Sequence, residues 1–320
     1  MDIKATLVTL IRDGFILVFN QDKLDIVRTA QALVEAGINN MEVTCRIKKP
    51  LEKLSRLRKE MPDFVAGSAS LIDWPGMTSV YNHLHQDDPL PSLQQVVDAG
   101  ACYLVSAVNF SDMGYKRFAG RVAMIPGCGS AAEVVTQFAR GANLCKVFPA
   151  RELGGPAFVE AIDPALHKMI SLVPTGGTTA ANIPDYINAG VLVLGGSFSM
   201  IEKPTLKKIV EEQDYRLLAK ELATVKRLID ETRAKKYPDL DFKKASLEEI
   251  RQVKGVGLVK AIEIKAALEL GVRLASHTER RRTRIRSAED VAGLLMTKFK
   301  QCETEYFKAL LLNTKHEVLN

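Results

Sequence analysis

Short apolar runs alternate with longer helical segments over the first three quarters of the chain. In the longer segments, apolar residues recur every three or four positions, as in residues 22–36, where Gly37 ends the pattern like a helix C-cap. Each short apolar run predicts a buried strand. The predicted strands cover residues 15–19, 38–44, 64–66, 101–106, 122–125, 144–148, 170–173 and 191–194.

Eight strands that alternate with helices within about 200 residues predict a parallel TIM (β/α)8 barrel. A doubly wound open sheet is the alternative. In a barrel the active site lies at the C-terminal ends of the strands, because the loops that follow the strands meet there. Polar residues at those ends are therefore the candidates for chemistry.

One predicted strand, residues 144–148, contains a lysine. Removing the charged amine of Lys146 from water has a high energetic cost. The side chain is therefore paired with a carboxylate, kept neutral, or extended to water from the strand end. A neutral amine is a nucleophile that forms Schiff bases with carbonyl compounds, so Lys146 is a candidate catalytic residue.

The second predicted strand ends in polar residues of period two. Glu42, Thr44 and Arg46 project to one side, whereas Val43 and Cys45 project to the other. One interpretation is a buried ion pair between Glu42 and Arg46. The other is a general base beside an arginine that binds a carboxylate. The sequence leaves both open.

Two Gly-Gly pairs directly follow the last two predicted strands. Glycine lets backbone N–H groups approach a phosphate closely, and barrels of this class often bind phosphate in these loops. Turns also use glycine, so the pattern by itself is only moderately specific. The candidate phosphate residues are Gly176, Gly177, Gly195, Gly196 and Ser197.

Composition narrows the class of protein. Hydrophobic residues make up 47% of the 320 residues, enough for a sizeable core. No apolar run approaches the ~20 residues of a membrane span, and the first residues lack the plan of a signal peptide. Five cysteines without paired spacing predict free thiols and a cytoplasmic location; they are Cys45, Cys102, Cys128, Cys145 and Cys302.

A segment between the third and fourth predicted strands, residues 71–92, holds several potential metal ligands. They are His83, His85, Asp87 and Asp88. The spacing does not define a third ligand beside the two histidines, so we expect no bound metal. We interpret the segment as a solvated surface insertion.

The last quarter of the chain has a different character. Residues 241–320 contain 16 Lys+Arg and 11 Asp+Glu, against 28 and 27 in residues 1–240. Two helical patterns flank a Gly-x-Gly turn, which predicts a helix-hairpin-helix over residues 239–282. Such a hairpin offers backbone N–H groups and lysines to DNA phosphates, here Lys254, Gly255, Gly257 and Lys260. A purely structural helical hairpin is the alternative.

An ordered set of motifs over about residues 5–235 resembles the 2-keto-3-deoxy-6-phosphogluconate (KDPG) / 4-hydroxy-2-oxoglutarate (KHG) family of class I aldolases. The motifs are residues 41–46 (MEVTCR), 66–68 (AGS), 125–128 (IPGC), 146–150 (KVFPA), 174–177 (PTGG) and 195–197 (GGS).

The resemblance implies a role for each matching residue. Lys146 would form the Schiff base, and Glu42 would transfer protons. Arg46, Ser68 and Thr175 would bind the 2-keto acid. The phosphate end would lie against Gly176, Gly177, Gly195, Gly196 and Ser197.

The resemblance also implies the reaction. The protein would be a lyase of the Entner–Doudoroff type of carbohydrate metabolism that cleaves KDPG to pyruvate and glyceraldehyde 3-phosphate. It would also cleave KHG to pyruvate and glyoxylate. It would need no cofactor or metal and would form a homotrimer.

The chain departs from the family's pattern in three places. They are Ser68 in place of the family's threonine, the stretch 106–108 (SAV) in place of Ser-Pro-Gly, and the longer segment 71–92.

Residues 243–320 resemble the beginning of the DNA repair protein RadC family. The matching motifs are residues 254–257 (KGVG), 267–271 (ALELG), 287–292 (SAEDVA) and 310–315 (LLLNTK). The zinc ligands of that family's metalloprotease-like domain would lie past residue 320, so we predict no zinc site. The predicted domains are therefore an aldolase barrel (1–238), a helix-hairpin-helix (239–282) and a truncated metalloprotease-like α/β fragment (283–320).

The two resemblances leave an alternative function. In it, the chain is a DNA-binding helix-hairpin-helix protein that carries a catalytically inactive barrel. The aldolase reading predicts a covalent adduct with pyruvate, whereas the alternative predicts weak, salt-sensitive binding to DNA without such an adduct.

Overall fold

The computed structural model describes residues 2–166 and 169–236, together with the isolated positions 287 and 291. The predicted helix-hairpin-helix with Lys254, Gly255, Gly257 and Lys260, and the predicted fragment 283–320 apart from those two positions, lie outside the described residues.

Parallel strands form the centre of the described region, in two hydrogen-bonded sheets. The first sheet has the order β5-β4-β3-β2-β1-β9 and the second the order β6-β7-β8. The strands are β1 (Phe15–Phe19), β2 (Asn40–Thr44), β3 (Val65–Leu71), β4 (Tyr103–Ser106), β5 (Ala123–Ile125), β6 (Gly127–Cys128), β7 (Cys145–Val147), β8 (Leu172–Pro174) and β9 (Leu194–Ser197).

Pro126 separates β5 from β6 and marks the junction of the two sheets. β5 pairs with β4, and after Pro126 the same run of chain pairs with β7. A proline has no backbone N–H to give to a ladder, so it suits such a break. With β5 and β6 counted as one broken strand, each of the eight predicted strands overlaps an observed one. The last is displaced: residues 191–194 were predicted, but β9 is Leu194–Ser197, because these residues pair with β1. β8 and β9 lie next to each other and complete the ring.

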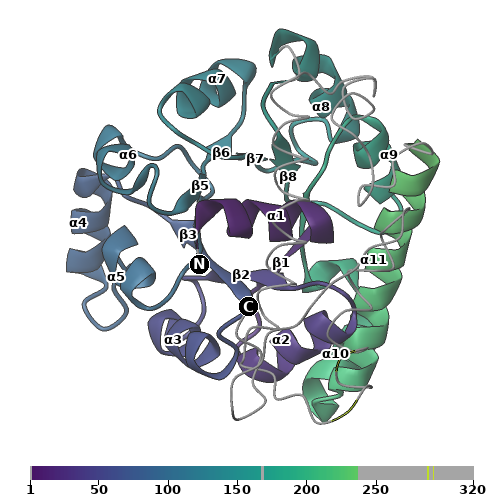
Figure 1. Cartoon of the computed structure of the whole chain (residues 1–320). Helices are drawn as coiled ribbons and strands as arrows, with labels where there is room; N and C mark the ends of the chain where they lie inside the picture. Colours follow the sequence, from purple (N-terminus) through teal and green to yellow (C-terminus); the bar gives the residue numbers. More distant parts are fainter. Residues whose placement is uncertain (1, 167–168, 237–286, 288–290, 292–320) are drawn as a thin grey trace. The chain divides into compact units, whose positions relative to one another are not determined.

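Helices surround the strands (Figure 1). Because β9 pairs with β1 and contacts β8, the ring of strands is closed, which excludes the open doubly wound sheet. They are α2 (Ile26–Glu35), α3 (Pro50–Glu60), α4 (Pro75–Leu84), α5 (Leu93–Asp98), α6 (Asp112–Phe118), α7 (Ala131–Ala139), α8 (Pro156–Ile162), α9 (Ile183–Asn188), α10 (Lys203–Glu212) and α11 (Tyr215–Lys236), with short 3-10 turns η1 (Asp163–Leu166) and η2 (Phe198–Met200).

An N-terminal helix, α1 (Ile3–Asp13), lies across the ring of strands (Figure 1), and our sequence analysis did not predict it. The Asp2 side chain caps its start by accepting from the Ala5 N–H, and Gly14 ends it with a left-handed φ of 71°. Leu10 is fully buried among the inward-facing strand residues. The helix therefore contributes to the inner core of the barrel.

Buried residues fall into two clusters that follow the alternation of the strands. The inner cluster includes Ile16, Val65, Tyr103 and Val173, which face the interior of the barrel. The larger outer cluster fills the layer between strands and helices. Because side chains alternate along each strand, one strand supplies both layers. Polar residues on the inner face are thus held in a dry and closely packed interior.

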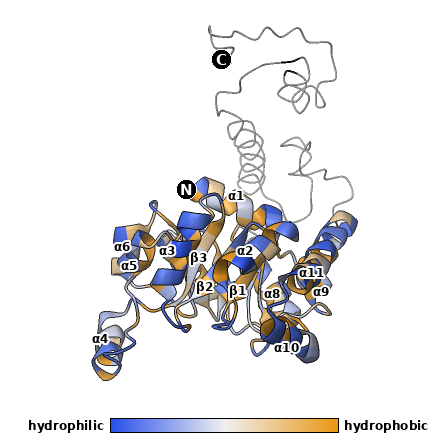
Figure 2. Ribbon diagram, turned by 90° about the horizontal axis from the view of Figure 1, so that it is seen from below, coloured by the Kyte–Doolittle hydropathy of each residue, from blue (hydrophilic) through white to orange (hydrophobic). Residues whose placement is uncertain are grey.

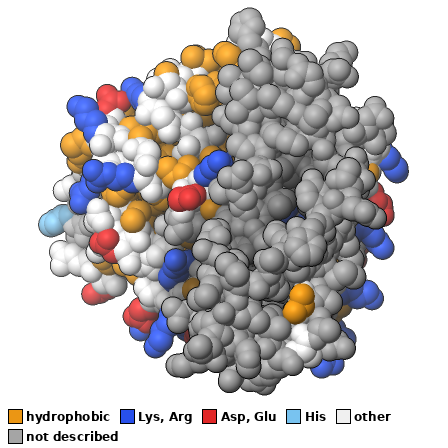
Figure 3. All heavy atoms as spheres, viewed as in Figure 1, with side chains coloured by type: hydrophobic (Ala, Val, Ile, Leu, Met, Phe, Trp, Pro, Cys, Tyr) orange, Lys and Arg blue, Asp and Glu red, His pale blue; other side chains and the backbone are white. Residues whose placement is uncertain are grey.

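The insertion 71–92 forms α4, which projects from the body on the side away from α1 (Figure 2). The helix has no buried residue, so the predicted surface position is confirmed for α4, whereas Leu71 and Pro91 near the ends of the segment are buried. Its exposed side chains are largely apolar, however, and they include Met77, Val80 and Leu84. On the face shown in Figure 3, the described acidic and basic side chains are interspersed, consistent with the near-balanced charge of residues 1–240.

Candidate active site

A buried ion pair lies at the centre of the candidate site. Lys146 Nζ is 3.1 Å from Glu42 Oε1, and the two side chains are 7% and 5% exposed. Lys146 comes from β7, where it is in register with Gly127 and Val173, and Glu42 comes from β2. The strands thus bring together two residues that lie 104 positions apart in the chain.

The pair answers two questions that the sequence left open. Lys146 does not extend to water, because it is buried and donates to a carboxylate. The predicted alternative of a Glu42–Arg46 ion pair is wrong, because the partner of Glu42 is Lys146. The physical reason is the inward direction of both side chains, whereas Arg46 follows the end of β2 in an exposed turn.

The pair is chemically competent for proton exchange. A distance of 3.1 Å lets the ammonium pass a proton to the carboxylate, which leaves a neutral amine as the nucleophile. The dry surroundings strengthen the interaction, and loss of either partner would leave an uncompensated buried charge. The ring of Phe148 also lies 5.4 Å from Lys146 Nζ. Lys146 and Glu42 can thus act as one acid–base unit.

Arg46 lies at the rim, next to two hydroxyl groups. Its Nε donates to Thr44 Oγ1 at 3.1 Å, and Thr44 Oγ1 is 2.7 Å from Ser70 Oγ. Ser70 adopts a left-handed φ of 62°, at an irregularity in the pairing of β3 with β4. Arg46 has no carboxylate partner within the described ranges 2–166 and 169–236. Its guanidinium is therefore available to an anionic ligand.

Ser68 lies on a different face from the ion pair. It is in register with Val43, while the preceding residue, Gly67, is in register with Glu42. Its hydroxyl is 3.4 Å from Cys45 Sγ, and both side chains are buried. Burial raises the pKa of the Cys45 thiol to about 11, against a weaker opposing effect of Ser68. The role predicted for Ser68 in substrate binding stays a prediction.

Thr175 and the first Gly-Gly pair continue from β8. Thr175 is buried, and its hydroxyl donates to the Val173 carbonyl at 3.4 Å. An added Cβ at Gly195 would lie 2.1 Å from Thr175 Oγ1, so only glycine leaves room for this threonine. Gly176 and Gly177 have left-handed φ values of 90° and 77°. The two Gly-Gly segments are thus packed together around Thr175.

The second Gly-Gly pair divides between the two layers. Gly195 is in register with Ile16 of the inner cluster, whereas a Cβ on Gly196 would meet Met200 and Phe15. The Ser197 hydroxyl accepts from the Ser199 N–H and so begins η2. Gly176 and Gly177 follow the end of β8, as predicted, whereas Gly195 and Gly196 lie within β9 rather than after it. The role of these residues at a phosphate stays a prediction.

Arg151 is a candidate that our sequence analysis missed. Its backbone N–H donates to the Gly176 carbonyl at 3.1 Å, and its Cβ lies 2.4 Å from where a Cβ of Gly177 would be. Its exposed guanidinium forms no ion pair with the part of the chain that the structure describes. The only sequence signal was a cation five residues after Lys146. Its position next to Gly177 links it to the predicted phosphate end.

The turn after β4 is held without the family's Ser-Pro-Gly. Ser106 Oγ donates to the Leu71 carbonyl at 2.7 Å and accepts from the Val108 N–H at 3.0 Å. A Cβ on Gly127 would lie 2.2 Å from Ala107, so the turn packs directly on β6. The departure at residues 107–108 therefore does not leave this corner of the barrel unsupported.

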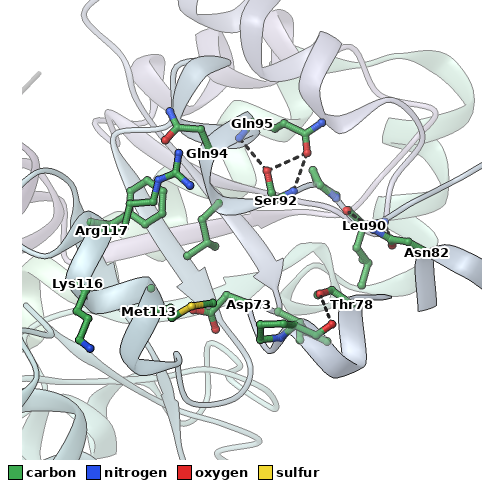
Figure 4. A pocket seen from close by; sticks show the side chains of 16 residues that line it. Asp73, Thr78, Asn82, Leu90, Ser92, Gln94, Gln95, Met113, Lys116 and Arg117 are labelled. Carbon is green, nitrogen blue, oxygen red and sulfur yellow. Dashed lines mark hydrogen bonds between the residues drawn. The ribbon is translucent and has the colours of Figure 1, made fainter. Parts of the chain in front are cut away.

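One cavity lies away from the ion pair. A cavity of about 560 Å³ lies between α4, α5 and α6 (Figure 4), and neither Glu42 nor Lys146 lines it. Its polar groups are mostly paired: Asn82 bonds the Leu90 backbone, and Ser92 forms a capping box with Gln95. Paired groups offer little to a ligand, so we do not assign the chemistry to this cavity.

His83 of α4 and His85, which follows its last residue, belong to no potential metal-binding group within the described residues. His85 stacks on Tyr81, with ring centroids 4.3 Å apart. Throughout residues 2–166 and 169–236, no group of three His, Cys, Asp or Glu side chains is arranged to hold a metal ion. Over the same residues, none of the helices is long and apolar enough to cross a bilayer.

Comparisons with known proteins agree with this geometry. The family model described as KDPG and KHG aldolase matches residues 89–217. The 2-dehydro-3-deoxy-phosphogluconate aldolase of Zymomonas mobilis is 30% identical over 209 residues, which cover 65% of this chain and 89% of that protein. The enzyme of the same name from Treponema pallidum is 31% identical over 176 residues, 54% of this chain and 75% of that protein.

A solved structure supports the same fold. The crystal structure of 2-keto-3-deoxy-6-phospho-gluconate aldolase from Zymomonas mobilis ATCC 29191 matches with a TM-score of 0.53 at 29% identity. The match covers 70% of this chain and 97% of that one.

The C-terminal region has different relatives. A UPF0758 protein of Desulforamulus reducens is 55% identical over 75 residues, or 23% of this chain. The match spans 33% of that protein, so this chain shares about a third of the relative's length. UPF0758 proteins belong to the RadC family, so the resemblance of the C-terminal region to that family is confirmed. The relatives and the shared fold together identify the main part of the chain, which belongs to the KDPG and KHG aldolase family of lyases.

Proposed function

We propose that this protein is a class I aldolase in which Lys146 forms a Schiff base with a 2-keto acid and Glu42 transfers the protons. The observation that carries the proposal is the 3.1 Å contact between the two side chains inside the barrel. A buried lysine that shares a proton with a carboxylate is suited to nucleophilic attack on a carbonyl carbon.

The reaction begins at the amine. Glu42 takes a proton from Lys146, and the neutral amine attacks the C2 carbonyl of the substrate. Glu42 then gives a proton to the carbinolamine hydroxyl, which leaves as water, and an iminium remains. The iminium is an electron sink beside the bond that must break.

Cleavage and release follow from the iminium. Glu42 takes the proton of the C4 hydroxyl while the C3–C4 bond breaks, and the electrons of that bond pass to the iminium and give an enamine. The aldehyde departs, Glu42 returns the proton to C3 of the enamine, and water hydrolyses the new iminium to pyruvate and free Lys146. One water is released and one consumed, so the cleavage is balanced.

Two groups of residues would orient the substrate. The substrate carboxylate would bind Arg46, whose guanidinium has no described anionic partner, beside Thr175. Ser68 keeps its predicted role in this pocket. The far end would bind Gly176, Gly177, Gly195, Gly196 and Ser197, with Arg151 as an added cation. Such an end suits a phosphate, so KDPG is the proposed substrate and KHG a poorer one.

Borohydride trapping with pyruvate tests the Schiff base. We expect one pyruvyl adduct per chain, mapped by mass spectrometry to the peptide that contains Lys146, and no adduct in Lys146→Met. Lys116→Met is the matched control, because Lys116 is exposed on α6. An adduct that persists in Lys146→Met, or that maps to another lysine of the folded protein, would sink the proposal.

The remaining predictions rest on resemblance. We propose a homotrimer, which light scattering of the full chain would show as three times the monomer mass. We also propose three domains: the barrel (1–238), the helix-hairpin-helix (239–282) and the truncated metalloprotease-like fragment (283–320). Weak non-specific DNA contact by Lys254, Gly255, Gly257 and Lys260 stays a prediction, which salt-dependent retention on DNA would test.

A further inference from the structure

A tyrosine inside the barrel has a hydroxyl without a hydrogen bond. Tyr103 is fully buried at the start of β4, in the inner cluster of side chains. Its hydroxyl has no hydrogen-bond partner. A buried hydroxyl left unpaired costs about 1–3 kcal/mol, so the native structure requires a reason for it.

The strand register places Tyr103 in the same row as Glu42. Glu42 of β2 is in register with Gly67 of β3, and Gly67 is in register with Tyr103 of β4. A Cβ on Gly67 would lie 2.2 to 2.5 Å from three atoms of the tyrosine ring. The ring therefore lies over Gly67, in the space that a side chain on β3 would fill. Neighbouring strands are only about 4.8 Å apart, so the ring spans the gap toward the strand of Glu42.

The phenol of Tyr103 stays protonated and can therefore always donate a hydrogen bond. Burial, and after it the negative charge of Glu42, raise the pKa of Tyr103 well above its usual range. Cys102 and Asp13 act in the same direction. The hydroxyl consequently keeps its proton at every working pH, and that proton is unused in the resting protein.

Glu42 needs another donor as soon as the reaction starts. In the resting structure its side chain accepts from Lys146 Nζ. An ammonium has three protons, whereas the nitrogen of an iminium or enamine has one. Formation of the Schiff base on Lys146 therefore removes most of the hydrogen bonding that holds the Glu42 carboxylate in place.

We propose that Tyr103 is a positioning residue that donates its unused hydroxyl proton to the Glu42 carboxylate once Lys146 is in the Schiff base. The hydrogen bond would hold the carboxylate while Glu42 exchanges protons with the substrate. This inference rests on the proposed function, because it requires a Schiff base on Lys146. The groups that face this row are Glu42, Cys102, Asp13 and, across the barrel, Lys146.

A structural role for the hydroxyl is the rival explanation. Asn40 lies two residues before Glu42 on the same strand, and its Oδ1 is also buried without a partner. Its amide nitrogen donates to Asp13 Oδ2 and to the Phe15 carbonyl, both at 2.9 Å. If the phenol served only the packing around Asn40, its removal would change stability and leave turnover alone.

Tyr103→Phe tests the proposal, with Tyr186→Phe as the matched control. Tyr186 on α9 is also fully buried with an unpaired hydroxyl, but it belongs to the outer cluster. Neither change removes a described hydrogen bond, so we expect both variants to fold with a thermal midpoint close to that of the wild type. For each variant, we would measure borohydride trapping with pyruvate and the pH profiles of kcat and KM.

For Tyr103→Phe we expect normal trapping on Lys146 and a KM within about twofold, with kcat roughly tenfold lower, a small part of what acid–base catalysis contributes. The variant lacks a hydrogen-bond donor to the charged form of the Glu42 carboxylate, so the acid limb of the kcat profile should move to higher pH. Tyr186→Phe should match the wild type in both respects.

The possible results distinguish a failure of this inference from a failure of the proposed aldolase function. If wild-type protein is not trapped on Lys146, the proposed function fails, and the inference fails with it. If trapping succeeds but Tyr103→Phe keeps the wild-type kcat and acid limb, only the inference is overturned. A loss of thermal stability in Tyr103→Phe with unchanged kcat would likewise overturn it, in favour of the structural role around Asn40.

Discussion

The outer cavity and the barrel interior differ in how their polar side chains are paired. The cavity between α4, α5 and α6 is large, but side chains such as Asn82 and Ser92 bond to their own neighbours. The barrel interior is tightly packed, yet it holds the ion pair of Glu42 and Lys146 and the unpaired hydroxyl of Tyr103. The comparison teaches that a buried ion pair and a buried donor without a partner mark a reactive site better than the volume of a cavity does.

The largest expected effect comes from breaking the charge inside the barrel. Glu42→Gln keeps the shape of the side chain but cannot take a proton, so we expect kcat to fall about 100-fold or more. The measurement is steady-state turnover of KDPG, with thermal melting to show that the protein is folded.

Glu52→Gln is the control for this variant, because Glu52 lies on α3 in an exposed pair with Lys49. It should retain wild-type turnover. Near-normal kcat in Glu42→Gln would remove Glu42 from the proton transfers and leave Lys146 without its assigned base.

A smaller effect is expected at the rim of the barrel. Arg151→Ala removes a cation that lies against Gly177, so we expect KM for KDPG to rise about tenfold. KM for the unphosphorylated KHG should stay within about twofold, because that substrate has no phosphate for the guanidinium.

Arg117→Ala provides the comparison for this experiment. Arg117 is an exposed arginine of α6 whose guanidinium lies over the ring of Phe118. Its loss should leave both KM values unchanged. An equal rise of both KM values in Arg151→Ala would show that Arg151 does not bind the phosphate group.

The smallest expected effect is in the outer cavity. Thr78→Val and Gln94→Ala alter two of its lining residues without touching the barrel interior. We expect kcat and KM for KDPG to stay within about twofold of the wild type, because distant sites without shared partners act independently. A loss of turnover greater than tenfold in folded protein would show that the outer cavity does take part in the reaction.

Much of the architecture follows from local pattern. Most strands were predictable because they are short apolar runs between helical segments, and the end of β2 was identifiable from the period-two spacing of Glu42, Thr44 and Arg46. The position of β9 was not, because Leu194–Ser197 is not an apolar run and becomes a strand by pairing with β1. The break at Pro126 was not predicted, because the run around it stays apolar and only the change of pairing partner reveals the break.

The site was only partly predictable. Lys146 stood out because a charge in an apolar run requires a partner. Ser68 matched a motif, but the register places it beside Cys45 on the face opposite Glu42. Arg151 looked like an ordinary surface cation until the fold brought it against Gly177.

The sequence by itself determined the alternation of strands and helices, though not α1 or the break at Pro126, and the presence of a lysine that needed a partner. These features depend on local spacing and on the cost of desolvation. Only the tertiary structure decided that Glu42 pairs with Lys146 rather than with Arg46, and that Tyr103 lies in the same row as Glu42, across Gly67. Those pairings depend on strand register and on contacts between residues far apart in the chain, which no local pattern specifies.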